Sequence, residues 1–216
     1  MARADNRYSR IVATLKVLLP LAAYLIGSIP WGLILTRLFT DIDIRRHGSG
    51  NIGATNVRRL AGTPLGLATL VGDVAKGAVP TYLAGALAPA SPLPLAGFVS
   101  LVALAAFLGH LFPLYTGLRE GGKGVATAAG AIAVISPLSV GIALAAFILA
   151  VAVSRRVSVG SLAAAVCLPF LTGGLTHSGV YGACAAVMAV FIIYRHKSNI
   201  RRLRDGTEPS FKDRPQ

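Results

Sequence analysis

The stretch VATAAGAIAVISPLSVGIALAAFILAVAV, residues 125–153, contains no charged side chain and decides the fold. A membrane-spanning helix needs about 20 mostly apolar residues, so this stretch is long enough to enter a bilayer. Ser136-Pro137 interrupts it near the middle, and proline breaks a helix. Lys123 precedes the stretch and Arg155-Arg156 follow it. Because basic loops collect on one side of a membrane, we expect two short crossings here.

The composition of the whole chain supports a membrane protein. Of the 216 residues, 54% are hydrophobic and 13% are charged, against about 25% charged in ordinary soluble domains. The net charge of +13 does not indicate nucleic acid, because most basic residues lie in short loops and in the C-terminal tail. Cys167 and Cys184 fall in apolar segments, which predicts packing residues and no disulfide or metal site. We expect no cofactor and no metal.

The predicted fold is an all-α polytopic membrane bundle of seven transmembrane helices. We interpret the chain as one integral membrane domain, residues 1–216, with a basic tail from about residue 195. The positive-inside rule places the N-terminus outside and the C-terminus in the cytoplasm. Arg3, Arg7, Arg10 and Lys16 lie on the wrong side in this arrangement. The expected spans are residues 14–36, 65–87, 95–112, 124–135, 138–153, 159–176 and 179–194.

A glycine-rich loop, GHLFPLYTGLREGGKGVAT at residues 109–127, precedes the fourth span. Backbone N–H groups of consecutive glycines can turn toward one anion, and a helix that begins at Gly124 directs its dipole at the same point. Lys123 adds a positive charge. Gly117 to Lys123 fits the Walker A pattern, but Gly124 stands where Ser or Thr should hold magnesium, and no strand precedes the loop. The pattern favours a phosphate cradle over an ATPase; a flexible loop at the lipid surface is the alternative.

A second polar segment, HGSGNIGATN at residues 47–56, lies in the expected first loop, residues 37–60. Glycine N–H groups, a serine hydroxyl, asparagine amides and the nearby Arg59 could hold a phosphate and a polyol. A solvated turn has the same residue types, but ten of them together favour a binding loop. The expected first span contains Pro20 and, near its end, Pro30, so we expect a bend that either lines a cavity or serves packing alone.

Ionisable residues elsewhere supply two further candidates. Asp73 and Lys76 lie at i, i+3 inside the second span, which predicts a structural ion pair or, as the less favoured choice, a lining of the site. In the tail, His196, Asn199 and Arg202 recur at helical spacing and would share one face. That face favours a site over a tail that only contacts anionic lipid.

These three polar segments together resemble the acyl-phosphate:glycerol-3-phosphate acyltransferases, the bacterial PlsY family of integral membrane enzymes. The resemblance covers nearly the whole chain. Its three motifs are GSGNIGATN from Gly48 with Arg59, then GH and FP from Gly109 followed by GGKGVAT from Gly121, and finally the tail residues His196, Asn199-Ile200, Arg202-Leu203, Gly206 and Glu208. Two departures are small: Arg119-Glu120 stands where the family usually has Phe-Lys, and Leu60-Ala61 replaces a polar-Leu pair.

The resemblance implies transfer of an acyl group from acyl phosphate to the sn-1 hydroxyl of glycerol 3-phosphate, which yields 1-acyl-glycerol 3-phosphate and phosphate. It implies three catalytic residues: His196, Asn199 and Ser49. His196 and Asn199 would orient or deprotonate the hydroxyl. The motif-two glycines and Lys123 would hold the acyl phosphate and the developing oxyanion. The implied substrate-binding residues are Asn51, Thr55, Asn56, Arg59, Gly121, Gly122, Lys123, Gly124, Ser158 and Arg202.

The implied partners are acyl phosphate, glycerol 3-phosphate and membrane lipid, with a functional link to an enzyme that forms acyl phosphate. The implied location is the bacterial cytoplasmic (inner) membrane, with the active site facing the cytoplasm. A transporter or channel for a phosphorylated anion is the alternative from another class. It would need polar residues along a path to both faces and often shows an inverted repeat. Here the polar segments gather on one face, and the sequence shows no convincing repeat.

Overall fold

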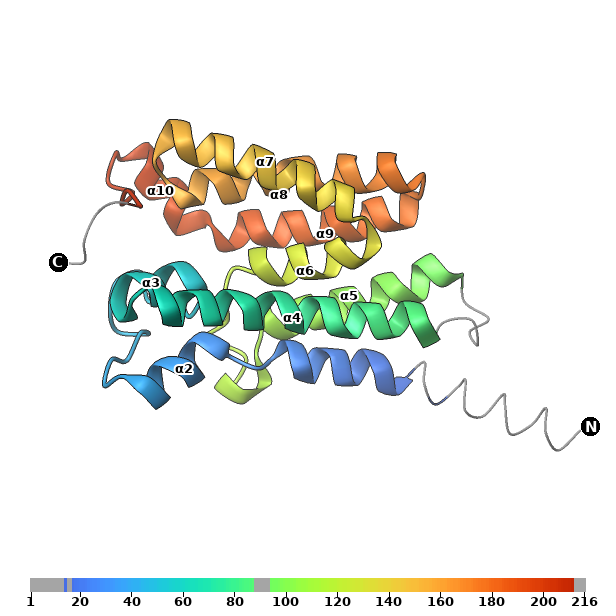
Figure 1. Ribbon diagram of the computed structural model, residues 1–216, viewed down its shortest axis with the longest axis horizontal. Coiled ribbons are helices and arrows are strands. Elements are labelled where there is room, and N and C mark those ends of the chain that lie inside the picture. Colours follow the sequence, from blue (N-terminus) through green and yellow to red (C-terminus); the bar gives the residue numbers. More distant parts are fainter. Residues whose placement is uncertain (1–13, 15–16, 88–93, 212–216) are drawn as a thin grey trace, which may run out of the picture.

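The computed structural model describes residue 14 and residues 17–87 and 94–211, and within these residues it contains helices and no β-strand. Long helices lie side by side in a bundle, and successive ones run in opposite directions along it (Figure 1). After a helical segment Val17–Gly27, the elements are α2 Trp31–Phe39, α3 Ala54–Ala61, α4 Thr63–Leu87, α5 Leu95–Leu111, η2 Leu114–Thr116, α6 Val125–Ile135, α7 Pro137–Ser154, α8 Val157–Thr176, α9 Gly179–Arg195 and α10 Lys197–Arg204.

Proline and serine determine where two of the predicted breaks occur. The first expected span is bent by 42° between Val17–Gly27 and α2, and Pro30 is the residue that precedes α2. The uncharged stretch at residues 125–153 divides at Ser136, whose side chain accepts a hydrogen bond from the Ser139 N–H at the start of α7. Both expected breaks are therefore confirmed, and α6 covers only part of the length of the bundle (Figure 1).

Length and composition identify fewer membrane spans than the seven predicted. In the described part of the chain, three helices are long and apolar enough to cross a membrane: Leu95–Thr116, α7 and α8. The count reaches five if each of two bent pairs, Val17–Gly27 with α2 and α9 with α10, forms one span. The 25-residue α4 contains the charged Asp73 and Lys76, and α6 has only 11 residues.

Apolar packing between α5, α6, α7, α8 and α9 forms the main core. Phe107, Leu111, Ile132, Met188 and Ile192 are among its buried side chains. Many large apolar side chains on the outer surface remain exposed. Of the 18 residues of α7, only 11% are buried inside the protein. Such an exposed apolar exterior is expected of helices that face lipid.

The polar segments differ from the prediction at one point. The expected loop at residues 37–60 contains α3, an eight-residue helix that holds Thr55, Asn56 and Arg59. Its sequence, ATNVRRLA, is short and rich in polar residues, so a search for long apolar segments could not reveal it. The tail is helical as predicted, because α10 begins after His196 and is bent by 55° from α9. The expected outer turn at residues 88–95 lies mostly outside the described residues.

Candidate active site

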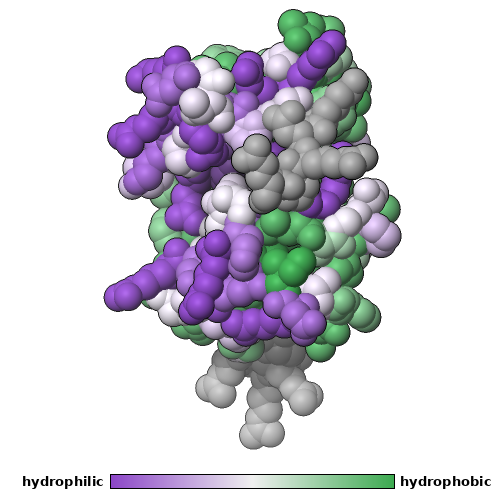
Figure 2. Space-filling view, turned by 90° about the vertical axis from the view of Figure 1, so that its left-hand side faces the viewer, coloured by the Kyte–Doolittle hydropathy of each residue, from purple (hydrophilic) through white to green (hydrophobic). Residues whose placement is uncertain are grey.

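A cavity of about 1160 Å³ begins at the polar end of the bundle and continues between the helices. Hydrophilic side chains gather on this end, where α3 and α10 lie (Figures 1 and 2). The polar lining of the cavity includes residues from the first loop, α3, the glycine loop and the tail, whereas α6, α7 and α8 supply a mainly apolar lining. The apolar residues include Val125, Ala129, Ala133, Val140, Ala143, Leu144, Phe147, Ala164, Ala165 and Leu168.

The first loop is held in shape by its own asparagines. Asn56 is buried; its side chain accepts a hydrogen bond from the Ser49 N–H (3.1 Å) and donates to the carbonyl oxygens of Ile44 and His47. Asn51 accepts from the Gly53 N–H at 2.9 Å, which closes an Asx turn. Ser49 is exposed and faces the cavity. The two amides thus shape the loop, and Ser49 presents its hydroxyl.

Two of the predicted substrate-binding residues lie on α3, directly after the first loop. Thr55 and Arg59 both line the cavity, one turn apart. Arg59 is half-buried and close enough to influence the charge of Lys123, whereas its neighbour Arg58 is exposed. Arg59 therefore brings a guanidinium to the same cavity that Lys123 and Gly124 line.

The segment Gly121–Gly124, which we call the glycine loop from here on, is held by contacts to its backbone from α5 and α9. The Gly122 N–H donates to the His110 carbonyl at 3.2 Å. Arg195 on α9 donates to the carbonyl oxygens of Gly121 and Gly122. Gly124, with a φ of 85°, then leads into α6, a conformation that glycine adopts without strain. The first N–H groups of α6 have no intrahelical acceptor, so they and the helix dipole favour an anion here.

Lys123 connects the glycine loop to the tail. Its Nζ donates to Asn199 Oδ1 at 2.6 Å, and Asn199 Nδ2 donates to Glu208 Oε1 at 2.7 Å. Arg202 Nε donates to Glu208 Oε2 at 2.7 Å. Burial and the nearby charges of Arg202, Arg59 and Arg195 together lower the pKa of Lys123 to about 8, although the charge of Glu208 raises it. Lys123 therefore keeps its positive charge near pH 7 but loses its proton more readily than an ordinary lysine.

Glu208 organises the tail, although no role had been predicted for it. Burial raises the pKa of Glu208, but its contacts with Ser158, Asn199 and Arg202 lower it more, so its pKa falls below the usual value. Its carbonyl oxygen also accepts from Arg156 Nε at 3.1 Å. Glu208 lies in the third motif, and the signal that could have identified it is an acidic residue within an arginine-rich tail.

His196 sits at the bend between α9 and α10 and is 2% exposed. Its Nδ1 lies 2.7 Å from the Ile192 carbonyl, and a carbonyl only accepts, so Nδ1 must carry the proton. Burial, reinforced by Lys123, lowers the pKa of His196 to about 4. The ring is then neutral near pH 7 and keeps a lone pair on Nε2.

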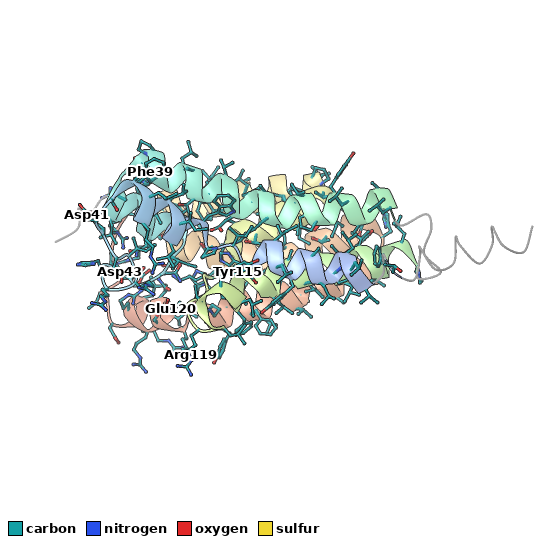
Figure 3. All side chains as sticks on the ribbon, turned by 90° about the horizontal axis from the view of Figure 1, so that it is seen from below. Phe39, Asp41, Asp43, Tyr115, Arg119 and Glu120 are labelled. Carbon is teal, nitrogen blue, oxygen red and sulfur yellow. The ribbon has the colours of Figure 1, made fainter. Side chains whose placement is uncertain are left out.

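Two loops of the site are also joined at the surface. Arg45 donates to both carboxylate oxygens of Asp43 and to Glu120 Oε2 at 3.0 Å. Asp43 and Glu120 lie at the same end of the molecule, on separate segments (Figure 3). Glu120, one of the departures from the family pattern, therefore has a partner in the first loop. Because these side chains are partly exposed, the pair contributes little stability.

The cavity brings together most of the predicted site residues. Gly121 and Gly122 are buried and lie outside its lining. The predicted residues that line it are Ser49, Asn51, Thr55, Asn56, Arg59, Lys123, Gly124, Ser158, His196, Asn199 and Arg202. The buried Ser158 hydroxyl lies beside the Glu208 carboxylate. Lining residues that had no predicted role in binding include Arg156, Glu208 and His110.

We expect Gly122→Ala to raise KM for the acyl donor by about tenfold or more, because misplacing a binding group by about 1 Å is costly. A Cβ at Gly122 would lie 2.0 Å from His110 Nε2. Gly122 has no positive φ, and the crowded group is His110. Steady-state kinetics with both substrates would measure the effect; equal changes in the two KM values would show a purely structural loop.

Fold and site together define an integral membrane protein with several anion-binding groups at the mouth of a cavity whose far part is apolar. The family model for glycerol-3-phosphate acyltransferase matches residues 17–206. The chain belongs to the glycerol-3-phosphate acyltransferase family.

Relatives and solved structures agree with this assignment. The chain is 48% identical to the glycerol-3-phosphate acyltransferase of Geobacter sulfurreducens, over 91% of this chain and 98% of that protein. It is also 48% identical to the glycerol-3-phosphate acyltransferase of Syntrophotalea carbinolica, over 89% of this chain and 95% of that protein. The crystal structure of PlsY (YgiH), an integral membrane glycerol 3-phosphate acyltransferase, in its glycerol 3-phosphate form, is 32% identical with a TM-score of 0.83, over 90% of this chain and 94% of that one. The lysophosphatidic acid form gives a TM-score of 0.81.

Proposed function

We propose that this protein transfers an acyl group from acyl phosphate to the sn-1 hydroxyl of glycerol 3-phosphate. The observation that carries the proposal is the single cavity that joins Arg59, Lys123 and Gly124 of the glycine loop, and an apolar compartment between α6, α7 and α8. Both proposed substrates carry a phosphate, and the donor also carries an acyl chain. The cavity offers basic groups for two phosphates and an apolar region for the chain.

In the proposed reaction the hydroxyl oxygen attacks the carbonyl carbon of the acyl phosphate. The bond from that carbon to the phosphate oxygen breaks, and inorganic phosphate leaves. His196 Nε2, whose lone pair is free because Nδ1 donates to Ile192, orients the hydroxyl or accepts its proton. Lys123 and the glycine loop hold the donor phosphate and the developing oxyanion. Ser49, Thr55 and Arg59 hold glycerol 3-phosphate, while Asn199 and Arg202 position Lys123 and Glu208.

The donor is tested by assaying purified protein with glycerol 3-phosphate and, in turn, acyl phosphate, acyl-CoA and acyl carrier protein. The proposal expects lysophosphatidate and an equal amount of inorganic phosphate from acyl phosphate only. Product from acyl-CoA or acyl carrier protein at a comparable rate, with none from acyl phosphate, would contradict it. An anion transporter is less well supported, because α6, α7 and α8 line their part of the cavity mainly with apolar side chains.

The proposed setting is the bacterial inner membrane, with seven crossings, the N-terminus outside and the site open to the cytoplasm. Support comes from the reversal of direction between successive long helices (Figure 1) and from basic residues at one end of the bundle. A chain with this arrangement would receive acyl phosphate from a cytoplasmic enzyme that forms it.

The topology is tested by cysteine labelling in a variant that lacks Cys167 and Cys184. Leu118→Cys, at an exposed position near the glycine loop, should react with an impermeant maleimide only from the cytoplasmic side. His177→Cys, in the α8–α9 turn, is the matched control and should react only from the other side. Labelling of position 118 only from the periplasm would overturn the orientation.

The reaction should also depend on the charge of Lys123. We expect kcat/KM for acyl phosphate to fall as pH rises through about 8, because Lys123 then loses the proton that attracts the donor phosphate. For a single titrating group of that pKa, roughly a tenth of the activity remains at pH ~9. Initial rates, corrected for spontaneous hydrolysis of the donor, give the profile. The descending limb should be absent from the residual activity of Lys123→Ala; if it persists unchanged, another group causes it.

A further inference from the structure

Three ionisable side chains lie buried next to the glycine loop: Asp73 and Lys76 on α4 and His110 on α5. Their side chains are 5%, 2% and 4% exposed, respectively. Lys76 Nζ lies 2.8 Å from Asp73 Oδ1, which confirms the predicted ion pair. His110 Nδ1 is 3.5 Å from the same oxygen and has no well-directed hydrogen bond to any of the described residues. Burying charged groups this deeply costs free energy unless they are paired, which indicates that these three side chains have a role in the protein.

One side of this cluster supports the glycine loop. The His110 carbonyl accepts the Gly122 N–H, and the His110 ring fills the space in which a Gly122 side chain would lie. Asp73 is the only carboxylate within 4 Å of the His110 ring among the described residues. Asp73 therefore faces the ring across 3.5 Å, and the ring in turn packs against the glycine loop at Gly122.

The other side reaches the first loop through the bend in the first span. Lys76 Nζ donates to the Ile29 carbonyl at 2.9 Å, directly before Pro30 and α2. Leu33 on α2 then packs in one buried cluster with Ile44 and Ile52 of the first loop and with Val57 of α3. From Asp73, contacts thus run through Lys76 to the segment that carries Ser49 and Arg59, and through His110 to the segment that carries Lys123.

We propose that Asp73, Lys76 and His110 form a positioning cluster that sets the distance between the two phosphate-binding segments. The cluster acts through Ile29 and Gly122 and does not itself bind substrate. This inference rests on the proposed assignment of the glycine loop to the donor phosphate and of Arg59 to glycerol 3-phosphate. Transfer between two bound substrates requires both to be held within a fraction of an ångström, so a shared support for both segments affects the rate directly.

The double variant Asp73→Asn/Lys76→Met tests the cluster. It removes both charges with little change in volume, and neutral replacement of a buried ion pair is often tolerated by the fold. The expected result is a melting temperature close to that of the original protein, kcat/KM lowered about tenfold or more, and weaker binding of both inorganic phosphate and glycerol 3-phosphate by calorimetry. Thr81→Val, also buried on α4 with its hydroxyl donating to the Gly77 carbonyl, is the control and should leave both binding constants unchanged.

Unchanged binding and kcat/KM in a folded double variant would overturn the inference, whatever the melting temperature. If the double variant does not fold, His110→Asn decides: it should weaken binding of inorganic phosphate more than that of glycerol 3-phosphate. Binding constants equal to those of the original protein would overturn the inference.

Lys123→Ala and Arg59→Ala are measured in parallel. If neither weakens binding of its anion, the proposed site assignment fails; if both do and the cluster variants do not, the cluster alone fails.

Discussion

Replacing Arg59 with alanine is expected to lower kcat/KM for glycerol 3-phosphate by about 30-fold to a few thousand-fold. Arg59 lines the cavity from α3 and is half-buried there. Losing a charged hydrogen-bonding partner in a desolvated site costs about 2–5 kcal/mol, and each ~1.4 kcal/mol is a factor of ten. Kinetics at saturating donor would measure the effect.

Two further variants show whether the effect belongs to Arg59 itself. Arg59→Lys should recover little activity, because guanidinium binds phosphate through a fork of two hydrogen bonds and ammonium acts as a point charge. Arg58→Ala is the control, since Arg58 is exposed and does not line the cavity. If Arg58→Ala loses activity and Arg59→Ala stays near normal, then α3 presents Arg58, and not Arg59, to the substrate.

Replacing Glu208 with alanine should be the second large effect. Asn199 Nδ2 and Arg202 Nε both donate to this carboxylate, and Asn199 in turn holds Lys123. Breaking a buried hydrogen-bonded charge pair costs about 2–5 kcal/mol; we expect the lower end, because the Arg202 side chain is 34% exposed. The free energy of unfolding should therefore fall by about 2–3 kcal/mol. Activity should fall at least ~30-fold, because Lys123 loses its fixed position.

The matched control is Asp205→Ala, which removes an exposed acidic residue from the same tail. It should leave unfolding and kcat/KM nearly unchanged, because exposed charges contribute little. Thermal unfolding in detergent and steady-state rates would separate the two variants. If Asp205→Ala matches Glu208→Ala in both measurements, net charge of the tail matters and the Glu208 hydrogen bonds do not.

Most helix positions could be predicted from the sequence because they depend on local chemistry. Apolar segments of span length are visible in the chain, and Pro30 and Ser136-Pro137 mark breaks that the structure confirms. The helix α3 could not be predicted in this way. It is short and polar, and its buried residues Asn56 and Val57 pack against a loop that sequence alone does not place.

The sequence indicated which residues would lie at the candidate site, but not which of them contact one another. Lys123 and Asn199 are 76 residues apart in the chain and 2.6 Å apart at their closest atoms, and no local pattern contains that information. The contacts of Glu208 and His110 were missed for the same reason, since their partners lie on other elements. The Asp73–Lys76 pair was predicted because i, i+3 spacing is local, whereas its contact with Ile29 is not.

One cavity is proposed to hold the phosphates at its polar mouth and the acyl chain between α6, α7 and α8. The most direct measurement is photolabelling with a lysophosphatidate that carries a diazirine at the end of its acyl chain, followed by mass spectrometry of the labelled residues. The claim predicts labels at lining residues such as Ala143, Phe147 and Leu168, lost when excess unlabelled lysophosphatidate is added. Labels confined to outward-facing residues such as Leu149 and Phe170, and unaffected by that excess, would contradict it.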